Sequence, residues 1–222
     1  MNNIKIVKQK EADKYFKRNL DFFKSEKSDC RIVDLIKANK INPKSILEIG
    51  CANGIKLNEY QQNCDSKINY GIDLSSKAIS SGRKKYKKLK LIRLSSLEIE
   101  KIKIKFDLII CGFFLYQLDR EEIFKQFDLI YKKLNNNGYL IIQDCDPLFK
   151  HTNSSIHNIH LKTFKMSYDN FLEESGLFKL IYKIRNNTEL MKAHDTRKFK
   201  SEDTALTLFK KIDFIESYPE DV

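Results

Sequence analysis

The sequence contains no long apolar run. No stretch approaches the roughly 20 consecutive apolar residues that a membrane-spanning helix needs. No apolar segment follows the opening residues 1–5 either, so no signal peptide is visible. From these two absences we expect a cytoplasmic protein that makes no use of a membrane.

Paired cysteines are also missing. The five cysteines are scattered, odd in number and nowhere spaced as Cys-x-x-Cys. In a chain without a visible signal peptide, this pattern favours reduced thiols over a disulfide framework or a zinc site. We therefore expect no structural metal. The cysteines are Cys30, Cys51, Cys64, Cys111 and Cys145.

Arginine is scarce although the chain is strongly basic. The formal net charge is +11, yet only seven of the 41 basic residues are Arg. Arg is the preferred residue for bidentate recognition of phosphates and bases. The densest basic cluster, residues 83–90, falls on a predicted surface helix and its exit. A nucleic-acid partner is therefore the weaker interpretation, and the Lys, Asn and Ile bias is typical of an AT-rich coding sequence.

With 222 residues, 41% of them hydrophobic, the chain can bury one sizeable core, which predicts a single domain. Apolar spacing predicts helices between Lys8 and Asn39 with two apolar faces, the second helix capped by Ser28 or Asp29. Asn42-Pro43 breaks the chain, and strands and helices then alternate. We predict strands at 45–49, 68–72, 89–94, 106–111 and 139–143, helices at 55–64, 76–89 and 120–134, and a turn at 135–138.

The part after Gln143 differs in pattern. Residues 144–167 are polar and lack a clean period, which predicts a long loop or lid. A short helix at 168–174 and two strands at 177–185 and 205–212 follow, the strands forming an antiparallel pair at the sheet edge. Short apolar strands that alternate with helices predict an α/β fold with a doubly wound, seven-stranded, mostly parallel sheet and one antiparallel edge strand. The single domain then divides into a helical N-terminal cap (1–42), a ligand-binding core (43–143), a lid (144–167) and the rest of the sheet (168–222).

Residues 46–54 form the most informative segment. The apolar strand Ile46–Ile49 ends in Gly50, and a second glycine, Gly54, precedes a predicted helix. Glycines at such a turn let the backbone approach a ligand closely, and the N–H groups of the next helix attract electron-rich atoms. Glu48 is an unusual acid for a buried strand.

Two further segments come to the same edge of the predicted sheet. Asp73 ends the second strand, where an acid can accept hydrogen bonds from the two hydroxyls of a ribose. Residues 111–118 follow the fourth strand. The glycine spacing Gly50-x-x-x-Gly54 differs from the Gly-x-Gly-x-x-Gly of dinucleotide sites, which disfavours a dehydrogenase.

Together these features resemble the class I S-adenosylmethionine-dependent methyltransferases, over about residues 46–143. Their first motif matches Glu48-x-Gly50-x-x-x-Gly54, with Ala52 where the family usually has glycine, and Asp73 matches the family's ribose-binding acid. The resemblance implies a Rossmann-like methyltransferase fold and S-adenosyl-L-methionine as the cofactor. The implied cofactor-binding residues are Glu48, Gly50, Cys51, Ala52, Gly54, Asp73, Leu74, Ser95, Ser96, Leu97 and Cys111.

The family's reaction is an in-line displacement at a sulfonium carbon, so the protein must align the reactants and, for a protonated nucleophile, supply a base. The candidate catalytic residues are Asp144, His157 and His160. The two histidines have other readings, as a metal pair or as solvated loop residues. Tyr116, Gln117 and Asp146 are predicted to bind the substrate, whereas Phe113 and Phe114 are more often core residues.

The segment from Asp144 to Tyr168 also resembles small methyltransferases of bacterial sugar and surface-polysaccharide gene sets. That resemblance implies a small-molecule acceptor, such as a sugar or a nucleotide-linked sugar. Two alternatives stay open: an RNA or protein methyltransferase that uses the basic surface, and a non-catalytic protein of the same fold that binds S-adenosylmethionine. The Asn-Pro-Pro-Tyr type of motif found after the fourth strand in amine-methylating RNA enzymes is absent, since residues 111–114 read Cys-Gly-Phe-Phe.

Overall fold

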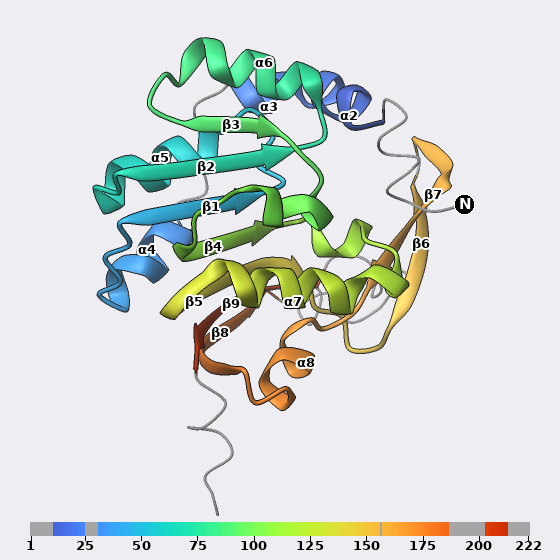
Figure 1. Ribbon diagram of the computed structural model, residues 1–222. Coiled ribbons are helices and arrows are strands. Elements are labelled where there is room, and N and C mark those ends of the chain that lie inside the picture. The colour runs from blue at the N-terminus through green and yellow to red at the C-terminus, as the bar shows by residue number, and fades with distance from the viewer. Residues whose placement is uncertain (1–10, 25–30, 156, 187–202, 213–222) are drawn as a thin grey trace, which may run out of the picture.

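A seven-stranded sheet forms the centre of the molecule (Figure 1). The computed structural model describes residues 11–24, 31–155, 157–186 and 203–212. The strand order is β3-β2-β1-β4-β5-β9-β8. The strands are β1 (Ser45–Ile49), β2 (Ile68–Asp73), β3 (Lys90–Arg93), β4 (Phe106–Gly112), β5 (Leu134–Cys145), β8 (Phe178–Asn186) and β9 (Thr204–Lys211).

The first five strands of the sheet are parallel, and β9 runs antiparallel to both β5 and β8. Strands β9 and β8 thus form the antiparallel pair expected at one edge. Strand β1 is buried along its whole length, as a parallel strand covered on both faces must be. The predicted fold class, a doubly wound and mostly parallel sheet of seven strands, is confirmed.

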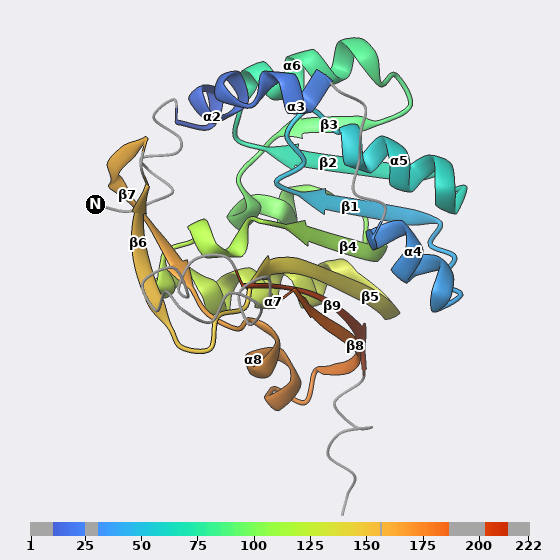
Figure 2. The ribbon, with the colours of Figure 1, turned by 180° about the vertical axis from the view of Figure 1, so that it is seen from behind.

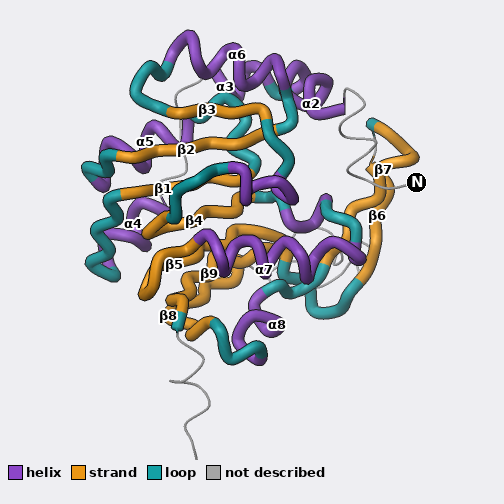
Figure 3. Tube along the Cα trace, viewed as in Figure 1, coloured by secondary structure: helices purple, strands orange, loops and turns teal. Residues whose placement is uncertain are grey.

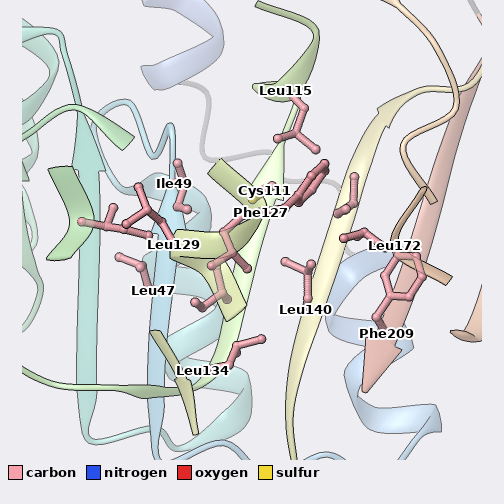
Figure 4. Close-up of a cluster of buried hydrophobic side chains, with 14 of the residues drawn as sticks. Leu47, Ile49, Cys111, Leu115, Phe127, Leu129, Leu134, Leu140, Leu172 and Phe209 are labelled. Atoms are coloured by element: carbon pink, nitrogen blue, oxygen red, sulfur yellow. The ribbon is translucent and has the colours of Figure 1, made fainter. Parts of the chain in front are cut away.

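Helices cover both faces of the sheet, as the front and back views show (Figure 2). Neighbouring residues of β1 divide between two buried clusters, because side chains alternate across a strand. Leu47 packs with Phe127 and Leu140 on one face (Figure 4), and Ile46 packs with Leu57 on the other. The helices are α4 (Arg31–Ala38), α5 (Ile55–Cys64), α6 (Ser76–Lys85), α7 (Ile123–Lys133) and α8 (Asp169–Glu174).

Two short helices, α2 (Ala12–Arg18) and α3 (Leu20–Lys24), precede α4 and run beside α6 (Figure 1). Phe16 and Phe23 are buried against Ile55 and Ala78. The prediction of helices between residues 8 and 39 is thus confirmed for the described residues of this region. The predicted caps Ser28 and Asp29, and also Cys30, lie outside the described residues. None of the described helices has the length and apolar character needed to cross a membrane.

The loop predicted for residues 144–167 is wrong. Much of this segment is a separate antiparallel hairpin of β6 (His151–Ser155) and β7 (Asn158–Lys165), drawn apart from the main sheet (Figure 3). Strand β6 reads His-Thr-Asn-Ser-Ser, so no apolar alternation announces it. Its regularity comes from backbone pairing with β7 and from the packing of β7 on the segment after β4.

The turn predicted for residues 135–138 is also replaced by strand. These residues belong to β5, where the register with β4 jumps from Phe106–Leu134 to Leu108–Tyr139. Asn137 takes a positive φ of 59° in this bulge. An Asn-Asn-Asn-Gly sequence suits a bulge as well as a turn, because both need left-handed backbone that Asn and Gly tolerate.

Candidate functional site

A cavity of about 520 Å³ opens at the carboxyl ends of β1, β2 and β4. Helices α2 and α3 close it on one side, and the β6–β7 hairpin contributes to another wall. This is the edge where an open α/β sheet offers its ligand crevice. Of the predicted site residues, those lining the cavity are Glu48, Gly50, Cys51, Ala52, Asp73, Leu74, Ser95, Ser96, Tyr116, Gln117 and His157.

The turn after β1 is held in left-handed backbone. Gly50 and Gly54 have φ of 77° and 78°, and Ala52 has φ of 48°. The N–H groups of Gly50 and Cys51 both donate to the carbonyl of Ile72, at 2.9 and 3.0 Å. The turn is therefore pinned to β2. Gly54 does not line the cavity; it closes the turn and precedes α5, and a Cβ there would lie 3.0 Å from Leu91.

Asp73 ties the tips of β1 and β2 together. Its Oδ2 accepts from the Ala52 N–H at 2.9 Å, and its Oδ1 accepts from the Ser75 N–H at 2.8 Å. Burial raises the pKa of this carboxyl, and the backbone N–H donors oppose that shift. The backbone N–H of Leu74 also acts on this carboxyl, and because a carboxylate offers about four lone-pair positions, Asp73 can still accept from a ligand in the cavity.

Glu48 also lines the cavity, but its carboxyl is hydrogen-bonded differently from that of Asp73. It is only 4% exposed, and its Oε2 has no hydrogen-bond partner among the described residues. Burial raises the pKa of Glu48 to about 8, although the positive charge of Lys56 pulls it down. A buried carboxyl with an unpaired oxygen is costly unless a ligand pairs with it. Glu48 is thus a ready partner for a cationic or hydrogen-donating ligand group.

Residues after β3 supply a polar wall. Ser95 and Ser96 both line the cavity, and the Ser95 hydroxyl accepts from the Leu97 N–H at 3.3 Å at the start of the 3₁₀ helix Ser96–Lys101. Leu97 and Cys111, two other predicted contacts, do not line the cavity. The thiol of Cys111 is fully buried in the core, and its pKa is raised by that burial.

The segment after β4 brings Tyr116 and Gln117 into the cavity. The Gln117 amide donates to the Tyr116 hydroxyl at 3.0 Å, and the Lys165 ammonium sits 4.6 Å from the centre of the Tyr116 ring. Burial raises the Tyr116 pKa above its usual 10, so the phenol keeps its proton. This proton can be donated to a bound molecule.

Arg120 joins the hairpin to that segment. Its guanidinium donates to the carbonyls of Leu115 and Leu118, at 3.0 and 2.6 Å, and stacks 4.7 Å from the Phe164 ring of β7. The hairpin is thereby anchored as a wall that carries Ser155, Leu161 and Thr163 to the cavity.

The structure places Asp144, one of the predicted catalytic candidates, in hydrogen bonds to backbone N–H groups. It does not line the cavity. Its Oδ2 accepts from the N–H groups of Phe114 and Leu115, at 3.0 and 2.8 Å, and its Oδ1 accepts from Cys145 at 2.7 Å. Asp144 therefore shapes the segment that holds Tyr116. Sequence position alone suggested a site residue because Asp144 ends a central strand.

Asp146, which is predicted to bind the substrate, also lies away from the main cavity. It is 1% exposed, and its Oδ2 lies 2.5 Å from Arg185 and 3.1 Å from Lys183, both on β8. It does not line the main cavity. The two cations could not be assigned to it from sequence, because β8 lies about 40 residues further along the chain.

Of the two histidines, only His157 can be placed. It lines the cavity from the hairpin and is exposed, and the side chain of His160 lies outside what the structure describes. A base role for either stays a prediction. Within the described residues, no three His, Cys, Asp or Glu side chains gather as a metal site would require.

The sequence predicts a helical N-terminal cap, but it did not show which residues of the cap line the cavity. Glu11, Tyr15, Arg18 and Phe22 line it, and so does Lys56 of α5. The available signal was the aromatic content of residues 15–23, which exceeds what one small helix buries. Tyr15 and Phe22 are 48% and 49% exposed.

Replacing Asp144 by Asn should change how stability depends on pH. The pKa of buried Asp144 is raised from the usual 3.8 to about 6, so the folded protein holds this proton more tightly than the unfolded chain does. The stability linked to this proton is fully present below about pH 4 and is lost as the pH rises through about 6. We expect the stability of the native protein relative to Asp144→Asn to fall by about 2 kcal/mol between pH 4 and 7.

Urea unfolding of both proteins at several pH values measures this difference. Asp128→Asn on the exposed side of α7 is the control, with a difference from the native protein that stays flat. A flat difference for Asp144→Asn as well would contradict the assignment.

A family model described as "methyltransferase domain" matches residues 42–202 of the chain. A curated relative, the uncharacterized protein RP028 of Rickettsia prowazekii (strain Madrid E), is 29% identical over 144 residues. That alignment covers 61% of this chain and 58% of the relative, so the match spans little more than half the length of the relative.

Solved structures resemble the whole fold at low sequence identity. The 1,6-didemethyltoxoflavin-N1-methyltransferase of Burkholderia thailandensis, with S-adenosylhomocysteine bound, has a TM-score of 0.70 at 10% identity and covers 95% of this chain and 89% of its own. Magnesium protoporphyrin IX methyltransferase from Synechocystis PCC 6803, with SAM bound, has a TM-score of 0.66 at 12% identity and covers 95% and 98%. The N-methyltransferase NodS of Bradyrhizobium japonicum WM9 has 0.59 at 16%, covering 82% and 85%.

Proposed function

Since this chain belongs to the methyltransferase domain family, we propose that it transfers a methyl group from S-adenosyl-L-methionine to a small-molecule acceptor. The observation that carries the proposal is the Oε2 of Glu48, which has no hydrogen-bond partner in the described part of the chain and lies in one cavity with Asp73 and the turn at Gly50. The similar structures with bound S-adenosylmethionine or S-adenosylhomocysteine support this choice of cofactor.

The residues at the cavity fit each part of this cofactor. Asp73 offers the carboxylate oxygens that suit ribose hydroxyls, and Ser95 with Leu74 and Leu94 offers a mixed polar and apolar wall that suits adenine. Glu48 offers an unpaired oxygen to an ammonium group. The positive φ values at Gly50 and Ala52 bring bare backbone to the cavity wall.

When bound, S-adenosyl-L-methionine would supply a methyl group on a positively charged sulfur, for which an acceptor nucleophile must stand in line with the carbon–sulfur bond that breaks. The chain's own residues orient and shield the reactants. Tyr116, held by Gln117 and Lys165, donates a hydrogen bond toward the acceptor, and the aromatic residues of α2 and α3 exclude water. The exposed imidazole of His157 is the group available to take a proton from an acceptor that carries one.

An acceptor of small size follows from how the cavity is bounded. Helices α2 and α3 and the β6–β7 hairpin both contribute walls, which suits an enclosed molecule better than a macromolecular chain. The toxoflavin and porphyrin methyltransferases among the similar structures act on small molecules, in keeping with this proposal. Among small molecules, a sugar or a nucleotide-linked sugar is the acceptor that we propose. We also propose a cytoplasmic location for the protein.

Calorimetric titration of the purified protein with S-adenosylhomocysteine tests the cofactor assignment. We expect one site per chain with a Kd in the micromolar range or below, on the order of −8 kcal/mol or better. NAD, titrated in the same way, is the control and should not bind. A folded protein that binds neither S-adenosylmethionine nor S-adenosylhomocysteine would sink the proposal.

A further inference from the structure

Lysines gather at the amino ends of the parallel strands, at the edge of the sheet away from the cavity (Figure 1). Each of the four neighbouring strands β2, β1, β4 and β5 is directly preceded by a lysine. The strand register brings these lysines side by side, because Ser45 pairs with Ile68 and Phe106 pairs with Leu134. Neighbouring strands lie about 4.8 Å apart, so the lysines form a short row. They are Lys67, Lys44, Lys105 and Lys133.

Two lysines at the start of β3 extend this row. Lys88 and Lys90 are both exposed, and the Lys90 ammonium donates to the Tyr70 hydroxyl of β2 at 3.3 Å. The row therefore crosses five strands, β3-β2-β1-β4-β5, without a break. We call these six residues the basic edge. They are Lys44, Lys67, Lys88, Lys90, Lys105 and Lys133.

The positive charge of the basic edge is only partly compensated. Lys67 forms an ion pair with Asp65 at 2.7 Å. Counting only described residues, no carboxylate lies within ion-pair distance of Lys44, Lys88 or Lys105. All three of these lysines are exposed. Their charges are therefore available to an anionic partner.

Lys133 responds to the same excess of charge. Its pKa is lowered, first by burial and then by the positive charges of Lys103 and Lys105, whereas Glu100 raises it. A further acid at this edge, Asp107, accepts from two backbone N–H groups at the start of β1. Cations that repel one another are thus held together by the fold, and an approaching polyanion relieves that repulsion.

A nucleic-acid backbone fits the basic edge better than a membrane does. The lysines follow one line across the strands, and phosphates along a nucleic-acid strand also follow a line. Membrane-surface segments add several exposed apolar side chains to their charges. At the basic edge, the described residues include one large exposed apolar side chain, Ile68, which is 41% exposed. The basic edge is built of Lys without Arg, which suits point contacts with phosphates and not bidentate recognition of bases.

We propose that the basic edge binds the phosphate backbone of a nucleic acid without reading its sequence. The cavity opens at the other edge of the sheet, so the nucleic acid is a docking partner and not the methyl acceptor. The sequence alone showed the cluster at residues 83–90, whereas the other lysines precede separate strands and come together only in the fold. The inference does not depend on the proposed methyl transfer.

Fluorescence anisotropy with a labelled oligouridylate of about 20 nucleotides measures this binding. With about five phosphates contacted, the logarithm of the association constant should fall against the logarithm of the salt concentration with a slope of about −3.5. This slope corresponds to about 100-fold weaker binding at about 200 mM than at about 50 mM salt. The native protein should bind with a Kd of about 10 µM or tighter at the lower concentration.

A triple variant, Lys44→Gln with Lys88→Gln and Lys105→Gln, removes half of the basic edge. We expect its slope to be shallower by about 2 and its binding at about 50 mM salt to be weaker by more than about tenfold. Its thermal unfolding and its titration with S-adenosylhomocysteine should match those of the native protein. If the triple variant does not fold, Lys44→Gln and Lys105→Gln alone should each make the slope shallower by about 0.7.

The matched control removes the same charge from exposed lysines of α2, α6 and α7, by Lys17→Gln with Lys77→Gln and Lys125→Gln. It should keep the native slope and bind within about threefold of the native protein. Equal weakening by both triple variants would show that binding follows net charge alone and would overturn the inference.

Two further results would also overturn the inference. One is a native protein that does not bind oligouridylate at about 50 mM salt. The other is binding to phosphatidylserine vesicles that needs the basic edge, without binding to oligouridylate, which would assign the edge to a membrane. In both cases the S-adenosylhomocysteine titration still decides the proposed function separately.

Discussion

Replacing Asp73 by Ala is expected to weaken S-adenosylhomocysteine binding by at least about 100-fold, because the proposed pair of charge-assisted hydrogen bonds to the ribose would be lost together. The same change removes the acceptor of the Ala52 and Ser75 N–H groups, so the tips of β1 and β2 lose their shared anchor. Calorimetric titration measures the affinity, and thermal unfolding measures the accompanying loss of stability.

A second variant separates the two effects. Asp73→Asn keeps the shape and one carbonyl-type acceptor, so we expect it to melt closer to the native protein and still to bind S-adenosylhomocysteine weakly. Asp65→Ala, at the exposed end of α5, serves as the matched control and should leave binding unchanged. An Asp73→Ala protein that binds as tightly as the native chain would show that the ribose contact is misplaced.

Replacing Gly82 by Ala is expected to produce the largest loss of stability from a single added methyl group. A Cβ at Gly82 would lie 2.2 Å from the carbonyl oxygen of Asn53 and 2.5 Å from Leu91. Backbone cannot yield as a flexible side chain can, so α6 must move away from the turn after β1. We expect a loss of about 3 kcal/mol, since the clash outweighs the gain of about 1 kcal/mol that Ala brings to a helix interior.

Thermal and urea unfolding measure this change, and S-adenosylhomocysteine titration should show weaker binding, because the displaced turn carries Ala52 and Cys51 at the cavity wall. Gly112→Ala is the matched control for stability. A Cβ there would meet nothing within 4 Å, so its unfolding free energy should stay within about 1 kcal/mol of the native value. A Gly82→Ala protein as stable as the native one would refute this packing.

The local sequence pattern correctly predicted those elements that depend on residues close together in the chain. Strand β1 and helix α5 begin and end where their apolar runs and flanking glycines predict. The Ser75 hydroxyl accepts from the Ala78 N–H at 3.0 Å, as expected of an N-cap. The hairpin at residues 151–165 was not predicted because β6, which reads His-Thr-Asn-Ser-Ser, has no apolar alternation of its own.

The same division holds for the candidate site. Glu48, Asp73 and Tyr116 could be placed at one edge from sequence, because parallel strands bring their carboxyl ends together whatever their neighbours are. The fate of Asp144 could not be predicted, because the N–H groups that hold it lie about 30 residues away, after β4. An acidic residue at the end of a strand gives the same sequence pattern whether its carboxylate faces a ligand or accepts hydrogen bonds from a loop.

The sequence by itself therefore determined the order of strands and helices, the acids at the ends of β1 and β2, and the resemblance to a cofactor-binding family, all of which depend on residues close together in the chain. Only the tertiary structure showed which side chains of the predicted N-terminal cap line the cavity and what fastens the cap there. Helix α2 is fastened by the hydrogen bond from Ser75 to Asp13, across 62 residues, and Gly82 must be small because of the Asn53 carbonyl. Contacts between segments so far apart depend on how the elements pack, which no local pattern encodes.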